Sequence, residues 1–137
     1  MYTQPVADLQ DLIEKPTERE GVELKSWLDF NEKLSRASTA RHLAALSNYG
    51  GGYLVFGFND DGSRCEPLPK VRELYSHDVF AGIVDKYLNP KFQCAVSFVA
   101  AEGVEHPVVW VPPHGATPVF SKGDGPQDAR EALHRSG

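Results

Sequence analysis

The hydrophobic pattern changes period in one central stretch, residues 33–62, which predicts a helix followed by a strand. In its first half, small or apolar residues recur at the i, i+3, i+4 and i+7 spacing of a helix: Ala40, Leu43, Ala44 and Ser47. Hydroxyl side chains that suit a first helical turn come just before: Ser35, Ser38 and Thr39. Asn48 or Gly50 can end this helix, because both residue types adopt positive φ.

The second half of the stretch predicts a buried strand. Residues 53–58 are apolar on both faces and rich in aromatic and branched side chains, which favours a central strand covered from both sides. The sequence that follows, Asn59-Asp60-Asp61-Gly62, has strong turn chemistry and predicts a hairpin.

Shorter patterns precede the central stretch. Residues 6–15 place apolar side chains on one side of a short helix, which Pro16 ends. Residues 22–27 alternate as a strand, so Glu23 and Lys25 are expected to project from the same face.

The second half of the chain predicts a helix and another hairpin. Residues 64–72 contain two prolines and predict an exposed loop. Residues 79–88 carry the clearest helical spacing in the chain and stop before Asn89-Pro90. The strands expected after this helix are residues 92–100, 107–111 and 118–120.

Together these elements predict an α+β fold, a single-domain mixed β-sheet with helices packed on it. The 137 residues, taken as one domain, are enough to bury a substantial core. We expect the core at about 14–122 and a polar, poorly determined tail at 123–137, with one helical turn at 129–134. No glycine fingerprint for nucleotides is present, so no nucleotide cofactor is expected.

The composition is typical of a soluble globular protein, with 41% hydrophobic and 24% charged residues. No apolar run approaches the roughly 20 residues needed to cross a membrane, and the first residues lack the features of a secretion signal. We therefore expect a cytoplasmic protein without a membrane partner. Cys65 and Cys94 lack zinc-type spacing and are expected to be free thiols.

Charge is distributed unevenly. The net charge of -5 argues against a protein whose whole surface binds nucleic acid. From Lys33 to Asn59, however, no acidic residue occurs, while Lys33, Arg36 and Arg41 add positive charge. This local reversal of sign predicts a basic patch on an otherwise acidic protein.

Several motifs occur together in one known family. They are Glu18-x4-Glu23-Leu24-Lys25, Asn48-x-Gly50-Gly51-Gly52 with the strand to Gly57, the turn Asp60-Asp61-Gly62, Pro118-Val119-Phe120 and, weakly, Arg135-x-Gly137. With these motifs the chain resembles the Schlafen AlbA-like domain of prokaryotic regulators and Schlafen proteins, which implies nucleic-acid binding. The resemblance covers most of the chain after Glu14. Asn59, where the family often has an acid, and the interruption at 123–129 depart from the pattern.

The same resemblance implies a second function, metal-dependent RNA cleavage. Schlafen ribonucleases carry a similar set of acids and a lysine, which would correspond here to Glu18, Glu23, Lys25 and Asp60 or Asp61. Carboxylate oxygens suit Mg²⁺ or Mn²⁺, and a lysine can balance charge that develops on a phosphate. The alternative from the residues alone is a surface ion pair between Glu23 and Lys25, which would contribute little.

Phosphate contacts are predicted at the basic residues and at the glycine turn: Lys25, Lys33, Arg36, Arg41, Gly50, Gly51 and Gly52. His42 is a further candidate. The backbone N–H groups of the glycines can approach a phosphate, but a helix cap and tight turn explain the same residues and are favoured. Aromatic side chains near these positions could stack on bases, although core packing is their default role: Trp27, Tyr49 and Tyr53.

The sequence thus favours a nucleic-acid-binding domain whose partner is DNA or RNA. One alternative is a divalent-metal endoribonuclease with Mg²⁺ or Mn²⁺ as cofactor. The other is a protein-interaction or dimerisation module with neither activity. A homodimer, or fusion to a larger regulator, is compatible with each of these functions.

Overall fold

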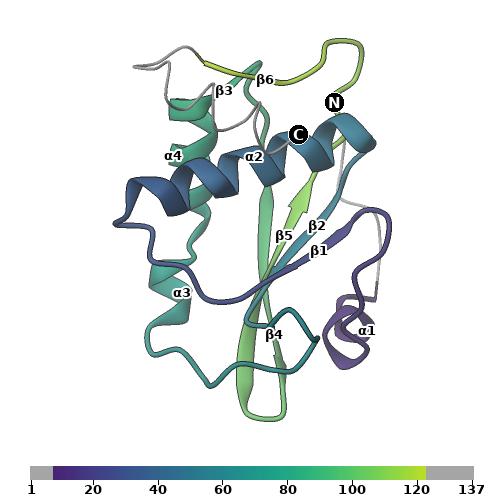
Figure 1. The fold of residues 1–137 in the computed structure, drawn as a ribbon, viewed down its shortest axis with the longest axis vertical. Helices are drawn as coiled ribbons and strands as arrows, with labels where there is room; N and C mark the ends of the chain where they lie inside the picture. The colour runs from purple at the N-terminus through teal and green to yellow at the C-terminus, as the bar shows by residue number, and fades with distance from the viewer. Residues whose placement is uncertain (1–7, 123–137) are drawn as a thin grey trace.

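The computed structural model describes residues 8–122 and has the α+β architecture predicted, with helices packed on a mixed sheet (Figure 1). The helices are α1 (Leu9–Glu14), α2 (Lys33–Tyr49), α3 (Val71–Leu74) and α4 (His77–Tyr87). The strands are β1 (Val22–Lys25), β2 (Gly52–Phe56), β3 (Leu88–Asn89), β4 (Ala95–Ala101), β5 (Val104–Val111) and β6 (Phe120–Ser121).

The main sheet has the strand order β1-β2-β5-β4. Strand β1 runs parallel to β2, whereas β2–β5 and β5–β4 are antiparallel. Strand β2 is therefore an interior strand, and Leu54, Val55 and Phe56 are fully buried. The prediction of a central, buried strand is confirmed.

Alternation along β2 divides the core between the two faces of the sheet. Leu54 and Phe56 belong to the larger cluster, which includes the buried residues of α2, α3 and α4. Val55 belongs to the smaller cluster with Leu12 and Ile13 of α1. Figure 1 shows α2 lying across the sheet, α3 and α4 along one side of it, and α1 at the other side.

Helix α2 begins earlier than the sequence suggested. It starts at Lys33 after Glu32, which makes no side-chain capping bond, so the hydroxyls predicted as caps lie inside the helix. Thr39 and Ser47 are instead buried against the core together with Leu43. The helix ends at Gly50, which has φ 135° and donates its backbone N–H to the carbonyls of Leu46 and Ser47.

Two predicted connections differ from the structure. The turn after β2 closes with a single bridge between Phe58 and Arg64, rather than with a second strand. The loop predicted at 64–72 contains Arg64, which is partly buried, and ends in α3. Arg64 is held inward because its guanidinium donates to the carbonyl of Ile13, 2.6 Å away, and to His106.

The ends of the predicted core also shift slightly. The short strand predicted at 118–120 is β6, which pairs with β3 rather than with the main sheet. The helix predicted at 6–15 is described from Leu9 to Glu14, and Ser76 caps α4 by accepting a hydrogen bond from the Val79 N–H. The helical turn predicted at 129–134 lies outside the described residues.

Close backbone approach explains two of the three consecutive glycines. A Cβ at Gly52 would lie 2.3 Å from the carbonyl oxygen of Gly21, and one at Gly51 would lie 2.9 Å from that of Val111. Gly51 also has φ 92°, which disfavours any other residue. The glycines thus let β2 start between β1 and the end of β5.

We expect Gly52→Ala to lower the free energy of unfolding by about 2–4 kcal/mol, because its Cβ would overlap backbone atoms that cannot move aside independently. Urea unfolding monitored by circular dichroism would measure this. Gly82→Ala is the matched control. Gly82 lies in α4 with open space at its Cβ position, so alanine there should raise stability by about 0.5–1 kcal/mol. Equal midpoints for both variants would contradict the packing argument.

Candidate functional site

Glu23 and Lys25 lie on the same face of β1, as their spacing predicted. Their partners in β2 are Leu54 and Phe56, which face α2, whereas Leu24 belongs to the cluster under α1. Because β1 is the edge strand of the sheet, both charged side chains are only half-buried. This places one acid and one base at the open boundary between β1 and α2.

His42 of α2 completes this group. Its Nδ1 lies 3.7 Å from the Oε1 of Glu23. Burial lowers the pKa of His42 to about 4, and the positive charges of Lys25 and Arg41 lower it further in the same direction. Burial raises the pKa of Glu23, and the nearby carboxylate of Glu18 adds to this, while Lys25 opposes it.

The contact between His42 and Glu23 is therefore not an ion pair at neutral pH. A close acid would favour a charged imidazole, but burial and two cations outweigh it, so His42 is neutral. Its Nε2 is buried and has no hydrogen-bond partner within residues 8–122. Glu23 and His42 instead lie at a partly desolvated site, where the positive charges of Lys25 and Arg41 both lower the pKa of the imidazole.

The other predicted acids lie around a different feature. Glu18, Asp60 and Asp61 line a shallow pocket together with Leu24, on the α1 side of β1. Asp61 accepts hydrogen bonds from the Ser63 hydroxyl and backbone N–H at 2.6 and 2.9 Å. These bonds hold the pKa of the Asp61 carboxyl below its ordinary value, so Asp61 stabilises the turn as a carboxylate.

The predicted metal ligands are not gathered into one group. Among residues 8–122, no three His, Cys, Asp or Glu side chains converge in an arrangement that could hold a metal ion. The strand alternation is the reason, since Glu23 points toward α2 while Asp60 and Asp61 border the pocket beside Leu24. The described residues therefore do not fit Mg²⁺ or Mn²⁺ at this site.

The basic residues of α2 point in different directions. Arg41 directly precedes His42 in α2, and its positive charge lowers the pKa of that imidazole. Arg36 instead donates to the carbonyl of Phe30 at 2.8 Å and lines a groove beside α4. Lys33 is exposed at the start of the helix. The acid-free run therefore does not form one basic face.

The aromatic candidates are also divided. Tyr49 is 57% exposed, and its hydroxyl lies 2.6 Å from a carboxylate oxygen of Glu20. Trp27 packs against Tyr75 and His106 and donates its Nε1–H to the carbonyl of Glu66. Tyr49 is therefore accessible beside the glycine turn. Trp27 packs in the core, as the sequence favoured for it.

His106 is the important buried residue that its sequence position did not single out. It is fully buried, its Nε2 accepts from Arg64 Nε at 3.0 Å, and its Nδ1–H donates to the carbonyl of Phe56 at 2.9 Å. A lone histidine in a strand of valines carries no sequence signal for such a role. His106 is therefore a structural residue of the core.

These features define a class of small α+β domain, with a glycine turn entering a central strand and an acidic turn leaving it. The chain belongs to the family described as Schlafen, AlbA_2, whose model matches residues 18–137. No curated protein matches the chain significantly. No helix among residues 8–122 is long and apolar enough to span a membrane.

Two solved structures share the fold. One is the N-terminal domain of a Nitrosomonas europaea protein named as related to the ATP-dependent DNA helicase RecG, with 22% identity and a TM-score of 0.59 over 88% of this chain and 84% of that domain. The other is the DIP2311 protein of Corynebacterium diphtheriae, with 19% identity and a TM-score of 0.56. That match covers 77% of this chain but only 20% of the other.

The lowered pKa of His42 predicts acid sensitivity. An unfolded His42 would bind a proton near pH 6.5 and the folded one only near pH 4, so stability should fall as the pH drops between these values. The loss from His42 is at most about 2–3 kcal/mol, reduced by its partial exposure. Urea unfolding at pH 7.5, 6 and 5 would measure it.

His42→Gln should remove only part of this pH dependence. The pKa of His106 is also lowered, by burial first, so it contributes in the same direction, whereas the raised pKa of Glu23 opposes it. Titration of the His42 ring protons by NMR provides the direct check. A midpoint near pH 6.5 in the folded protein would contradict the assignment.

Proposed function

We propose that the chain is a nucleic-acid-binding domain that contacts phosphates at the boundary between β1 and α2. The observation that carries this proposal is the position of Lys25 on the α2 face of β1, near the partly buried His42, whose pKa the positive charges of Lys25 and Arg41 both lower. Cations at a partly desolvated site attract an anion more strongly than fully solvated ones do. Membership of the Schlafen, AlbA_2 family and the DNA-helicase-related name of one structural relative support the same function.

The contact surface that we propose consists of Lys25 and Arg41 at its centre, with Lys33 and the glycine turn Gly50, Gly51 and Gly52 as outer positions. Gly50 has open space around its Cβ position, whereas the other two glycines are already required by packing. Tyr49, exposed at the end of α2, could stack on a base. Arg36 is the least supported of the predicted contacts, because it faces the groove beside α4.

His42 gives this proposal a specific consequence. The same cations that lower its pKa would be partly neutralised by a bound phosphate. Nucleic-acid binding should therefore raise the pKa of His42. Binding should also tighten as the pH falls below 6.

The salt dependence of binding tests the phosphate contacts. The logarithm of the binding constant should fall linearly with the logarithm of salt concentration, by about 0.7 to 0.9 for each phosphate contacted. Lys25→Ala and Arg41→Ala should each reduce this slope by about one contact and weaken binding of all sequences alike. Fluorescence anisotropy with single- and double-stranded DNA and RNA between 25 and 200 mM salt would measure both effects.

The matched control is Lys15→Ala, which removes the same charge from an exposed side chain on the α1 side of the sheet. It should leave the slope unchanged. Binding that does not depend on salt, or equal losses in all three variants, would place the interaction-module alternative ahead.

Glu23→Gln separates a binder from a metal-dependent nuclease. Removing a negative charge beside Lys25 and His42 should tighten nucleic-acid binding by a few-fold, because Glu23 repels phosphate.

For the endoribonuclease alternative, residues 8–122 provide no group of three converging metal ligands. We expect the native protein to show no Mg²⁺- or Mn²⁺-dependent cleavage of structured RNA. Cleavage that Glu18→Gln and Glu23→Gln both abolish would overturn this expectation.

A further inference from the structure

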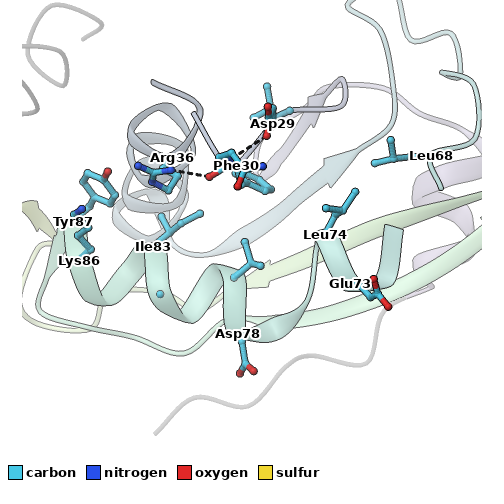
Figure 2. Close-up of a pocket in the computed structure, with 14 residues that line it drawn as sticks. Asp29, Phe30, Arg36, Leu68, Glu73, Leu74, Asp78, Ile83, Lys86 and Tyr87 are labelled. Carbon is cyan, nitrogen blue, oxygen red and sulfur yellow. Dashed lines mark hydrogen bonds between the residues drawn. The ribbon is translucent and has the colours of Figure 1, made fainter. Parts of the chain in front are cut away.

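A groove of about 570 Å³ lies between the start of α2 and the exposed side of α4 (Figure 2). Its walls include the apolar side chains of Phe30, Leu68, Val79 and Ile83. This volume lies within the range of about 300–1,000 Å³ typical of small-molecule sites, which are likewise mostly apolar with a few polar groups. The groove is separate from the boundary between β1 and α2 where Lys25 and His42 lie.

One end of the groove carries unused hydrogen-bonding capacity. The Tyr87 hydroxyl is buried, in a residue only 6% exposed, and has no hydrogen-bond partner within residues 8–122. A buried polar group without a partner typically costs about 1–3 kcal/mol, so a ligand that bonds to it gains that energy back. Figure 2 shows Tyr87, Lys86 and Arg36 together at this end.

Arg36 is positioned to act as the principal anchor. Its hydrogen bond to the Phe30 carbonyl, at 2.8 Å, fixes the side chain through one of its five N–H donors. A guanidinium held in this way presents its remaining donors in a planar fork, which matches the two oxygens of a carboxylate. Lys86 adds a second positive charge at the same end.

Acidic side chains also border the groove. Glu73 and Asp78 lie toward the end opposite Lys86, with Asp78 at the start of α4, and Asp29 lies next to Phe30, whose carbonyl Arg36 contacts. Eight residues of helix separate Asp78 and Lys86 by about 12 Å. An anionic ligand is therefore attracted most strongly to the end that holds both Arg36 and Lys86, which favours one orientation.

Gly82 leaves the floor of the groove open. It lies within α4, has no atoms within 4 Å of its Cβ position, and therefore has no packing reason to be glycine. Glycine inside a helix costs about 0.5–1 kcal/mol relative to alanine. The missing side chain instead provides room for an apolar group between Val79 and Ile83.

We propose that this groove binds a small apolar carboxylate, aromatic or branched aliphatic. Its carboxylate would pair with Arg36 and Lys86 and accept a hydrogen bond from the Tyr87 hydroxyl. Its apolar part would lie over Gly82 against Phe30 and Ile83. This site is independent of the proposed nucleic-acid contacts, which lie around Lys25 and His42.

The probe for this site is 1-naphthoate, compared with the cation 1-naphthylmethylamine and the neutral 1-naphthalenemethanol. Binding to the full chain would be followed by amide chemical shifts in ¹⁵N-labelled protein and by calorimetry. We expect naphthoate to bind at least 10-fold tighter than either analogue, with the largest shifts in α4 and residues 28–31. Equal affinities for the three probes, or shifts centred elsewhere, would overturn the proposal.

Three variants locate the interaction. Gly82→Leu should fill the floor and lower naphthoate affinity at least 10-fold, and it should fold because the side chain enters open space. Arg36→Gln should lower it by a similar factor and abolish the preference for the anion, while Tyr87→Phe should lower it about 5-fold. Lys25→Ala is the control and should change nothing. Unaltered binding in Gly82→Leu, with native chemical shifts elsewhere, would overturn the proposed site.

Discussion

A close backbone approach between Gly21 and Gly52 sets the geometry on which the candidate site depends. The Gly21 carbonyl accepts the Tyr53 N–H at 2.7 Å, and no side chain can stand at Gly52 because its Cβ would lie 2.3 Å from that oxygen. This contact fixes the parallel register of β1 against β2. The register in turn directs Glu23 and Lys25 toward α2, where they meet His42.

The other end of β2 is fixed by a second glycine and a buried histidine. A Cβ at Gly57, which has φ 98°, would lie 2.5 Å from the Nδ1 of His106, and the imidazole stacks on Phe58 with ring centroids 4.3 Å apart. Because Arg64 donates to Nε2, Nδ1 carries the proton and donates to the Phe56 carbonyl. An apolar strand thus has a fully hydrogen-bonded polar anchor where it ends. The acidic turn begins directly after this anchor, so its position follows from it.

The sequence predicted what depends on local pattern and failed where distant contacts decide. Alternation placed Glu23 and Lys25 on one face, and the apolar run 53–58 predicted the central strand, because both signals lie within single elements. The predictions for the start of α2 and for an exposed Arg64 were wrong. No local signal shows that Arg64 bonds to Ile13 and His106. The bond from Arg36 to the Phe30 carbonyl likewise depends on a contact outside the helix.

The basic residues of the acid-free run are close in sequence but face different sides of α2 in the structure. Arg36 and Arg41 are five residues apart, and such a spacing turns them about 140° from each other around a helix. One therefore faces the groove beside α4 and the other the boundary with β1. Each side has its own nearby acids, Glu73 and Asp78 in the first case and Glu23 in the second. An acidic protein can thus present two small cationic sites on opposite sides of one helix, and each site would select its anion by shape as well as by charge.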